Sequence, residues 1–297
     1  MPPRRFLTTL ALLLVCGLVF STVALASDVP KEHTHAGAEA TAGLPFEPTE
    51  QLVFEGEFSK LLLRGIKIAE LKFTAGRKVE LLASVPAAEG ETKALAAPLV
   101  FTGDIESKGW FRKLFGINFR FHAESTVASD SFAVMRTTKT DEQGKRIRQS
   151  EAVFDRAANK IEWTERDPNN TGEPPRVVTA PLGGAMFDII SALYFLRTQN
   201  LEPGRTLDLI VSDSAQVYHV PTQVFAERKK MKSVVGKVSV VRLDIGLFGQ
   251  NRPVAGDGKM SLWVTDDARR IPLRARMSNN MGTLDISLKS INTAAAR

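Results

Sequence analysis

Cysteine is almost absent from this sequence. The single cysteine, Cys16, lies in an apolar stretch near the start of the chain, within a segment that we expect to be removed. A mature chain without cysteine has no disulfide framework, no thiol nucleophile and no thiolate metal site. Its fold must therefore depend on its core, and about 270 residues can bury a sufficient one.

Histidine is also scarce, and the familiar catalytic motifs are missing. The chain has four histidines, and only His122 and His219 lie outside the polar N-terminal region. A catalytic serine needs a positioned base, and no Gly-x-Ser-x-Gly elbow, His-Glu-x-x-His, phosphate-binding glycine loop or calcium loop occurs. His33 and His35 could hold a metal only with a third ligand. We therefore expect no enzymatic activity, no cofactor and no metal, with a hydrolase of unusual design as a minor alternative.

Positive charge is in excess but is not concentrated. The 39 Lys and Arg residues outnumber the 33 Asp and Glu residues and give a formal net charge of +6. The densest basic run is 228–230 with Lys232, which is typical of a solvated strand end or turn, or of a contact with anionic lipid or polysaccharide. This scattered charge, on an exported chain, argues against a nucleic-acid partner.

The first 26 residues have the pattern of a secretory signal peptide. Arg4 and Arg5 precede an apolar run from Phe6 to Phe20, and 24–26 (Ala-Leu-Ala) offers small residues at the cleavage site. A membrane anchor and a lipoprotein modified at Cys16 are weaker alternatives. We expect a signal peptide at 1–26, periplasmic export, a flexible linker at 27–44, one β-rich domain at 45–291 and a tail at 292–297.

From Pro45 onward the chain alternates apolar and polar residues with a period of two. Leu52, Phe54 and Phe58 fall on one side of the first run, and Glu55 and Glu57 on the other. Similar runs recur near residues 117–124, 207–211, 260–264, 273–277 and 284–288. One buried and one solvated face is typical of antiparallel strands. Turn residues, including 75–76 (Ala-Gly), separate the runs. The pattern predicts a mainly β protein, an antiparallel meander of about a dozen strands curled into an open barrel or a sandwich.

One segment, at about 185–198, departs from this alternation. Its apolar residues recur at helical spacing on two sides, with Phe187, Ile190, Leu193 and Tyr194 on one and Ile189 and Leu196 on the other. A helix that is apolar on both sides is expected to be buried on both sides. We therefore predict one helix inside the curled sheet, either as a plug that completes the core or as the wall of a ligand cavity.

Several of these segments together resemble a known family. They are 188–197 with the Leu-Glu-Pro-Gly turn at 201–204, the run 262–267 with 270–273, and the ending 282–284. Over nearly all of 54–288 the chain resembles the bacterial exported family called domain of unknown function 3108. The resemblance implies an antiparallel sheet curled into an open barrel around a helix, similar to periplasmic lipoprotein-carrier folds, and it implies no activity. The chain departs from the family at Ala69 and at 107–116.

Two sets of residues are candidates for binding. If the helix faces a cavity, a lipid-like or amphipathic ligand is expected to contact Phe187, Asp188, Ile190, Ser191, Tyr194 and Arg197. Asp188 could instead be a buried hydrogen-bonding partner for strand ends. The aromatic and basic run around 110–115 predicts a peripheral contact with a membrane or an envelope protein partner, or a flap over the barrel end, through Trp110, Phe111, Leu114 and Phe115.

The sequence therefore leaves two main functions open. The first is a non-catalytic envelope protein that binds an apolar or amphipathic ligand within the curled sheet. The second is an assembly or interaction scaffold of the cell envelope without a small ligand. A cavity beside the helix would favour the first function, and a packed core there would favour the second.

Overall fold

The computed structural model describes residues 43–77, 97–108, 118–225 and 228–293. The expected signal peptide, nearly all of the expected linker and the 110–115 run lie outside the described residues. Among the residues that are described, no helix is long and apolar enough to cross a membrane.

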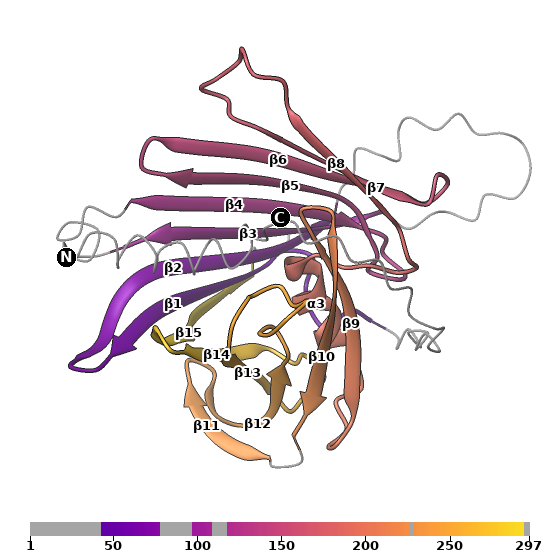
Figure 1. Ribbon diagram of the computed structural model, residues 1–297. Coiled ribbons are helices and arrows are strands. Elements are labelled where there is room, and N and C mark those ends of the chain that lie inside the picture. The colour runs from indigo at the N-terminus through magenta and orange to yellow at the C-terminus, as the bar shows by residue number, and fades with distance from the viewer. Residues whose placement is uncertain (1–42, 78–96, 109–117, 226–227, 294–297) are drawn as a thin grey trace, which may run out of the picture.

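The strands form one antiparallel sheet that follows the chain in a meander (Figure 1). In its first half, β1 to β8 lie next to one another in chain order, so that β1 is inside the sheet and β8 is at one edge. The strands of this half are β1 (Glu50–Lys60), β2 (Leu63–Arg77), β3 (Leu99–Ser107), β4 (Phe119–Val127), β5 (Val134–Gln143), β6 (Arg146–Asp155), β7 (Lys160–Arg166) and β8 (Arg176–Pro181).

The second half of the sheet continues from the other side of β1. The order there is β1-β15-β14-β13-β12-β10-β9, and β11 pairs with β12 beside this path. The strands are β9 (Thr206–Asp213), β10 (Gln216–Val224), β11 (Lys229–Ser233), β12 (Gly236–Ile245), β13 (Gly258–Thr265), β14 (Pro272–Asn279) and β15 (Gly282–Thr293). The sheet is curled but not closed, because β8 and β9 are its two ends. The predicted fold class is confirmed, with fifteen strands in place of about a dozen.

The predicted alternation sets the inner face of the sheet. In β1 the side chains of Leu52, Phe54 and Phe58 are buried, and Glu55 and Glu57 lie on the other face. The turn predicted at 75–76 is wrong. Ala75 and Gly76 belong to β2, where Ala75 is buried opposite Phe101 of β3, and cross-strand packing has outweighed the local turn preference.

Helix α3 (Ile189–Thr198) lies inside the curl of the sheet (Figure 1). It begins four residues later than predicted. Phe187 is extended and forms a parallel bridge with Val211 of β9, and Asp188 then caps the helix. The apolar spacing therefore begins before the helix does. The buried face of α3 is close to β3, since a Cβ added at Gly103 would lie 2.9 Å from Cδ1 of Ile190. The other side is less buried than predicted, because Ile189 is 39% exposed while Leu196 is buried.

Candidate functional site

The N-terminus of α3 is held by a buried carboxylate. Asp188 accepts hydrogen bonds from the hydroxyls of Ser125 on β4 and Thr137 on β5, the latter at 2.7 Å, and from the backbone N–H of Ser191 at 2.8 Å. The Ser191 hydroxyl accepts in return from the N–H of Asp188 at 2.9 Å, which completes a capping box. One side chain therefore both starts the helix and attaches it to two strands.

Substitution of Asp188 by alanine is expected to lower the free energy of unfolding by about 2–4 kcal/mol, because it removes a helix cap and leaves two buried hydroxyls without their acceptor. Urea denaturation followed by circular dichroism measures this loss. Asp155→Ala is the matched control, since that aspartate caps an exposed turn through a bond from the N–H of Ala158. Equal effects of the two substitutions would contradict the role of Asp188.

The C-terminus of α3 is held by a buried ion pair. The Arg197 guanidinium donates to both carboxylate oxygens of Glu50 on β1, at 2.5 and 3.2 Å. It also donates to the carbonyl oxygens of Pro45 and Arg269, at 3.1 Å each from its Nη2 atom. The two side chains are 1% and 0% exposed. A bidentate pair with further carbonyl acceptors is the geometry in which a buried charge is satisfied.

Aromatic rings pack along α3 between the polar contacts at its N-terminus and its C-terminus. The Tyr194 ring stacks on Phe101 with centroids 4.1 Å apart and meets Phe46 edge-on at 5.1 Å. Phe187 stacks on Phe195 at 4.3 Å. The sequence-based expectation that the sheet buries Phe187 and Tyr194 is confirmed, since both are under 7% exposed.

Most of the six candidate ligand residues at 187–197 therefore pack in the core or form hydrogen bonds within the protein. Phe187, Ile190 and Tyr194 lie in the core and line neither of two small hollows on the inner face of the sheet. Of the six, Asp188 alone borders one of those hollows. Contact of the set with a ligand stays a prediction.

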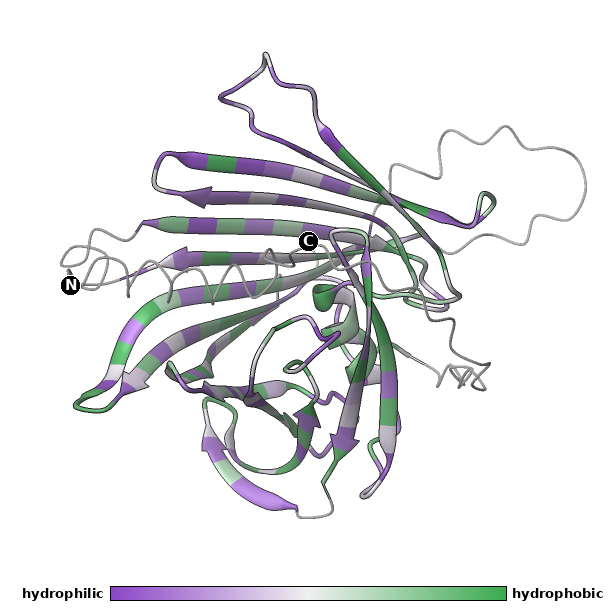
Figure 2. Ribbon diagram, in the orientation of Figure 1, coloured by the Kyte–Doolittle hydropathy of each residue, from purple (hydrophilic) through white to green (hydrophobic). Residues whose placement is uncertain are grey.

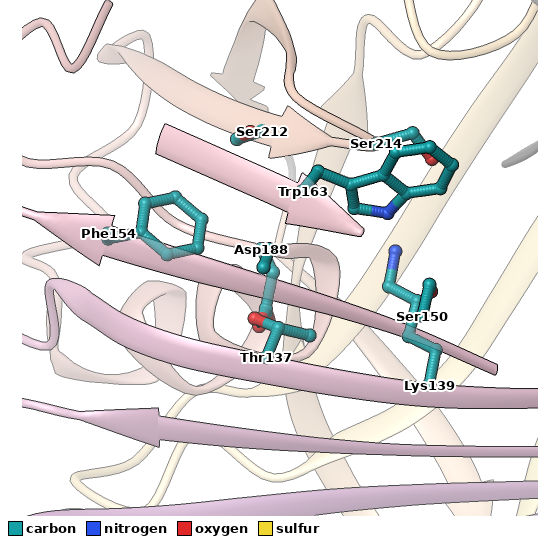
Figure 3. Close-up of a pocket in the computed structure, with 9 residues that line it drawn as sticks. Thr137, Lys139, Ser150, Phe154, Trp163, Asp188, Ser212 and Ser214 are labelled. Carbon is teal, nitrogen blue, oxygen red and sulfur yellow. The ribbon is translucent and has the colours of Figure 1, made fainter. Parts of the chain in front are cut away.

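The two hollows share lining residues on the inner face of β5–β7, against the turn between β9 and β10, and Figure 3 shows the one that Asp188 borders. Lys139, Ser150, Trp163 and Ser214 border both. Their volumes are about 10 and 20 Å³, which is room for about one water molecule each. Polar and apolar side chains line both hollows, and neither is large enough to enclose an acyl chain.

Lys139, the cation that borders both hollows, has a charged partner. The Lys139 ammonium forms an ion pair with the Asp213 carboxylate at the start of the β9–β10 turn. Burial alone would lower the pKa of Lys139, but the charge and hydrogen bond of Asp213 outweigh it and raise that pKa. Burial raises the pKa of Asp141, whose carboxylate accepts from the Gln143 amide at 3.0 and 3.1 Å. The contact with Asp213 therefore favours the protonated form of Lys139.

Histidine does not complete a catalytic pair at these hollows. None of the described residues that line them is a histidine. His122 and His219 lie on the outer face, where their Nδ1 atoms are 2.7 and 2.8 Å from the carboxylates of Asp104 and Asp208. The arrangement can bind through hydrogen bonds and charge, and no histidine is among the described residues that line the hollows with Ser150, Ser212 and Ser214.

The inner face of the sheet changes character between β4 and β5. Cross-strand pairing places Ile105, Phe121, Asp141 and Arg148 in one row, so two apolar residues are followed by two charged ones. The next row along repeats the change, from Gly103 and Ala123 to Lys139 and Ser150 on the same strands, and then to Glu165 of β7. In these two rows an apolar stretch and a polar stretch of the inner face meet between β4 and β5. The row nearer α3 does not divide in this way, since it runs through Phe101, Ser125, Thr137, Ala152 and Trp163.

The apolar side continues around the curl and is not fully covered. Phe58 of β1 is buried, but the inner-facing residues beyond it are only half-buried. They lie on β15, β14, β13 and β12 and are Ile286, Leu284, Met277, Met260 and Ile245. Figure 2 shows hydrophobic positions alternating along these strands. This half-buried apolar surface adjoins the packed core, since Ile245, Leu284 and Ile286 pack against the core residues.

Sequence analysis missed the polar half of this site. Lys139, Asp141 and Asp213 did not enter the candidate set, and neither did Glu50. The available signal was the position of Lys139 and Asp141 on the same side of β5 as the buried Thr137. A charge in an inward register position of a strand indicates a partner, although the partner itself lies far along the chain.

Comparison with known proteins gives a family and a fold. Residues 85–289, more than half of the chain, match the family model described as protein of unknown function (DUF3108). A crystal structure described as a β-barrel-like protein of domain of unknown function DUF1849 from Brucella abortus is similar, with a TM-score of 0.52, 7% identity, and coverage of 83% of this chain and 98% of that one. No curated protein matches the sequence.

Two further solved structures have lower scores. One is described as a candidate exported protein with a YmcC-like fold from Bacteroides fragilis, with a TM-score of 0.28, 8% identity and coverage of 84% and 98% of the two chains. The other is described as a candidate lipoprotein from Parabacteroides distasonis, with a TM-score of 0.29, 7% identity and coverage of 84% and 97%.

Proposed function

Since this chain belongs to the DUF3108 family of proteins of unknown function, we propose that it is a non-catalytic protein of the cell envelope that binds an amphipathic molecule on the inner face of its sheet. The signal pattern of residues 1–26 supports its release into the periplasm. The line between apolar and polar residues at β4 and β5 is the observation that carries the proposal.

The dimensions of the sheet suit such a ligand. Neighbouring strands lie about 4.8 Å apart, so Ile105 and Asp141, two strands apart in one row, are separated by about 10 Å. A polar head group beside Lys139 and Asp141 would therefore leave its apolar part over Ile105 and Phe121. Each CH₂ group buried there would contribute about 0.8 kcal/mol.

Substitution of Ile105 by asparagine is expected to weaken binding of an apolar fluorescent probe, N-phenyl-1-naphthylamine, at least fivefold, because it places an amide in the half-buried apolar face. Fluorescence titration of the purified protein measures the change. Val153→Asn is the control, since Val153 is 42% exposed and its neighbours Ala152 and Phe154 take the inner register positions of β6. Native mass spectrometry of protein purified from the periplasm without detergent would identify a copurifying ligand. Protein that purifies without any bound molecule and does not bind the probe would contradict the proposal.

A second function is favoured by the packing of α3. The helix is attached at both ends by buried polar groups, and stacked rings pack against its inner side. Such a rigid centre suits an assembly or interaction scaffold. Protein that purifies without a small ligand but together with an envelope protein would support the scaffold over the ligand-binding function.

A further inference from the structure

The turn between β1 and β2 presents three consecutive leucines to solvent. Leu61 is 86% exposed, Leu62 is 99% exposed and Leu63 is 53% exposed. Figure 1 shows this hairpin projecting at the edge of the molecule, and Figure 2 shows its tip as hydrophobic. Single exposed apolar residues are ordinary on a protein surface, but a contiguous exposed set at one tip marks an interaction site.

The fold does not require leucine at this turn. Leu61 has φ of 50°, in the left-handed region that a large side chain rarely adopts and that glycine or asparagine occupies with less strain. Turn chemistry would therefore select a small polar residue there. Leu61 makes the turn less favourable, and none of the three leucines belongs to the core, which indicates a role outside the fold.

The charges around the tip suit an anionic surface. Lys60 and Arg64 flank the leucines directly, and Lys67 follows on β2, where it pairs with Glu55 at 2.9 Å. Glu57 is the other acidic residue of the hairpin near the turn. Residues 55–67 thus carry three basic groups and two acidic groups, and the acidic Glu55 is the partner of Lys67. Leucines that enter the acyl region with cations at the head-group level are typical of an interfacial membrane contact.

We propose that the tip formed by Leu61–Leu63 inserts into the interface of a lipid bilayer that contains anionic lipid. The same hairpin carries Phe58 and Ile66 at its inner face, so docking would place the half-buried apolar surface of the sheet next to the bilayer. The proposal does not rest on ligand binding, since the tip can dock whether or not the inner face holds a molecule.

The test places a fluorescent label at the tip of the full chain. NBD is attached to Leu62→Cys in a Cys16→Ser background, and protein-free vesicles of phosphatidylethanolamine and phosphatidylglycerol are added. The NBD emission is expected to shift to shorter wavelength and to rise severalfold, and the change should weaken with added salt. The same label at Val177→Cys, on the exposed edge strand β8, is the matched control and should not respond.

A second variant measures the contribution of the leucines. Leu61→Asn with Leu62→Ser and Leu63→Ser is expected to lower the vesicle partition coefficient at least tenfold while unfolding at the same or a higher urea concentration, because asparagine tolerates the left-handed turn. Vesicle binding without a response at position 62 would overturn the proposal. So would binding that is lost only when Lys229, Lys230 and Lys232 become Gln, or a tip response that needs native membranes with their proteins.

Discussion

Substitution of Arg197 by methionine is expected to lower the free energy of unfolding by about 3–5 kcal/mol, because it leaves the Glu50 carboxylate buried without its cation. The pair is bidentate and both side chains are almost fully enclosed. Arg269 reaches the same carboxylate at 3.3 Å but is half-exposed, so it cannot replace Arg197. Urea denaturation with circular dichroism measures the loss.

A double variant separates charge from packing. Glu50→Leu combined with Arg197→Met removes both charges and keeps apolar volume, and it is expected to recover much of the stability that Arg197→Met loses. Additive losses from the two single variants, with no recovery in the double variant, would show that the ion pair is not the reason for the effect.

Substitution of Phe187 by alanine is also expected to lower the free energy of unfolding by about 3–5 kcal/mol, because it leaves a cavity in a packed core. Phe187 stacks on Phe195, and its backbone N–H and carbonyl bond to Ile210 and Ser212 of β9 at 2.9 and 2.8 Å. The side chain is therefore fixed at the place where the free edge of β9 meets the segment before α3. Equilibrium denaturation of the purified protein measures this loss of unfolding free energy.

Ile189→Ala, two residues along, is the matched control for this substitution. Ile189 is the first residue of α3 and is 39% exposed, so its truncation should cost well under half as much as that of Phe187. A loss below about 1 kcal/mol for Phe187→Ala would mean that the segment before α3 is peripheral to the core.

The fold class was predictable because its signal is local. Alternation such as that of Leu52, Phe54 and Phe58 depends only on the period of a strand, and it persists wherever one face is buried. The helix was found for the same reason, from its apolar spacing. Its start was placed too early because the apolar residue Phe187 fits a helical stripe and an extended bridge equally well, and only the β9 edge selects the bridge.

The candidate site was less predictable because its parts come together across the sheet. Asp188 and Arg197 could be singled out as polar residues on an apolar helix, but their partners Thr137 and Glu50 lie 51 and 147 positions away. The same holds for Lys139 and Asp213, 74 positions apart. Pairing at that distance depends on which strands become neighbours.

By itself, the sequence determined the strands, the buried helix and the two polar residues that need a partner, because each depends on periodicity or on the cost of burying an unpaired charge. The tertiary structure alone decided the curl of the sheet, the register that aligns Ile105 and Phe121 with Asp141, and the exposure of Leu61–Leu63. These depend on the order and register of fifteen strands, and that order is set by the summed packing of the whole sheet around one helix.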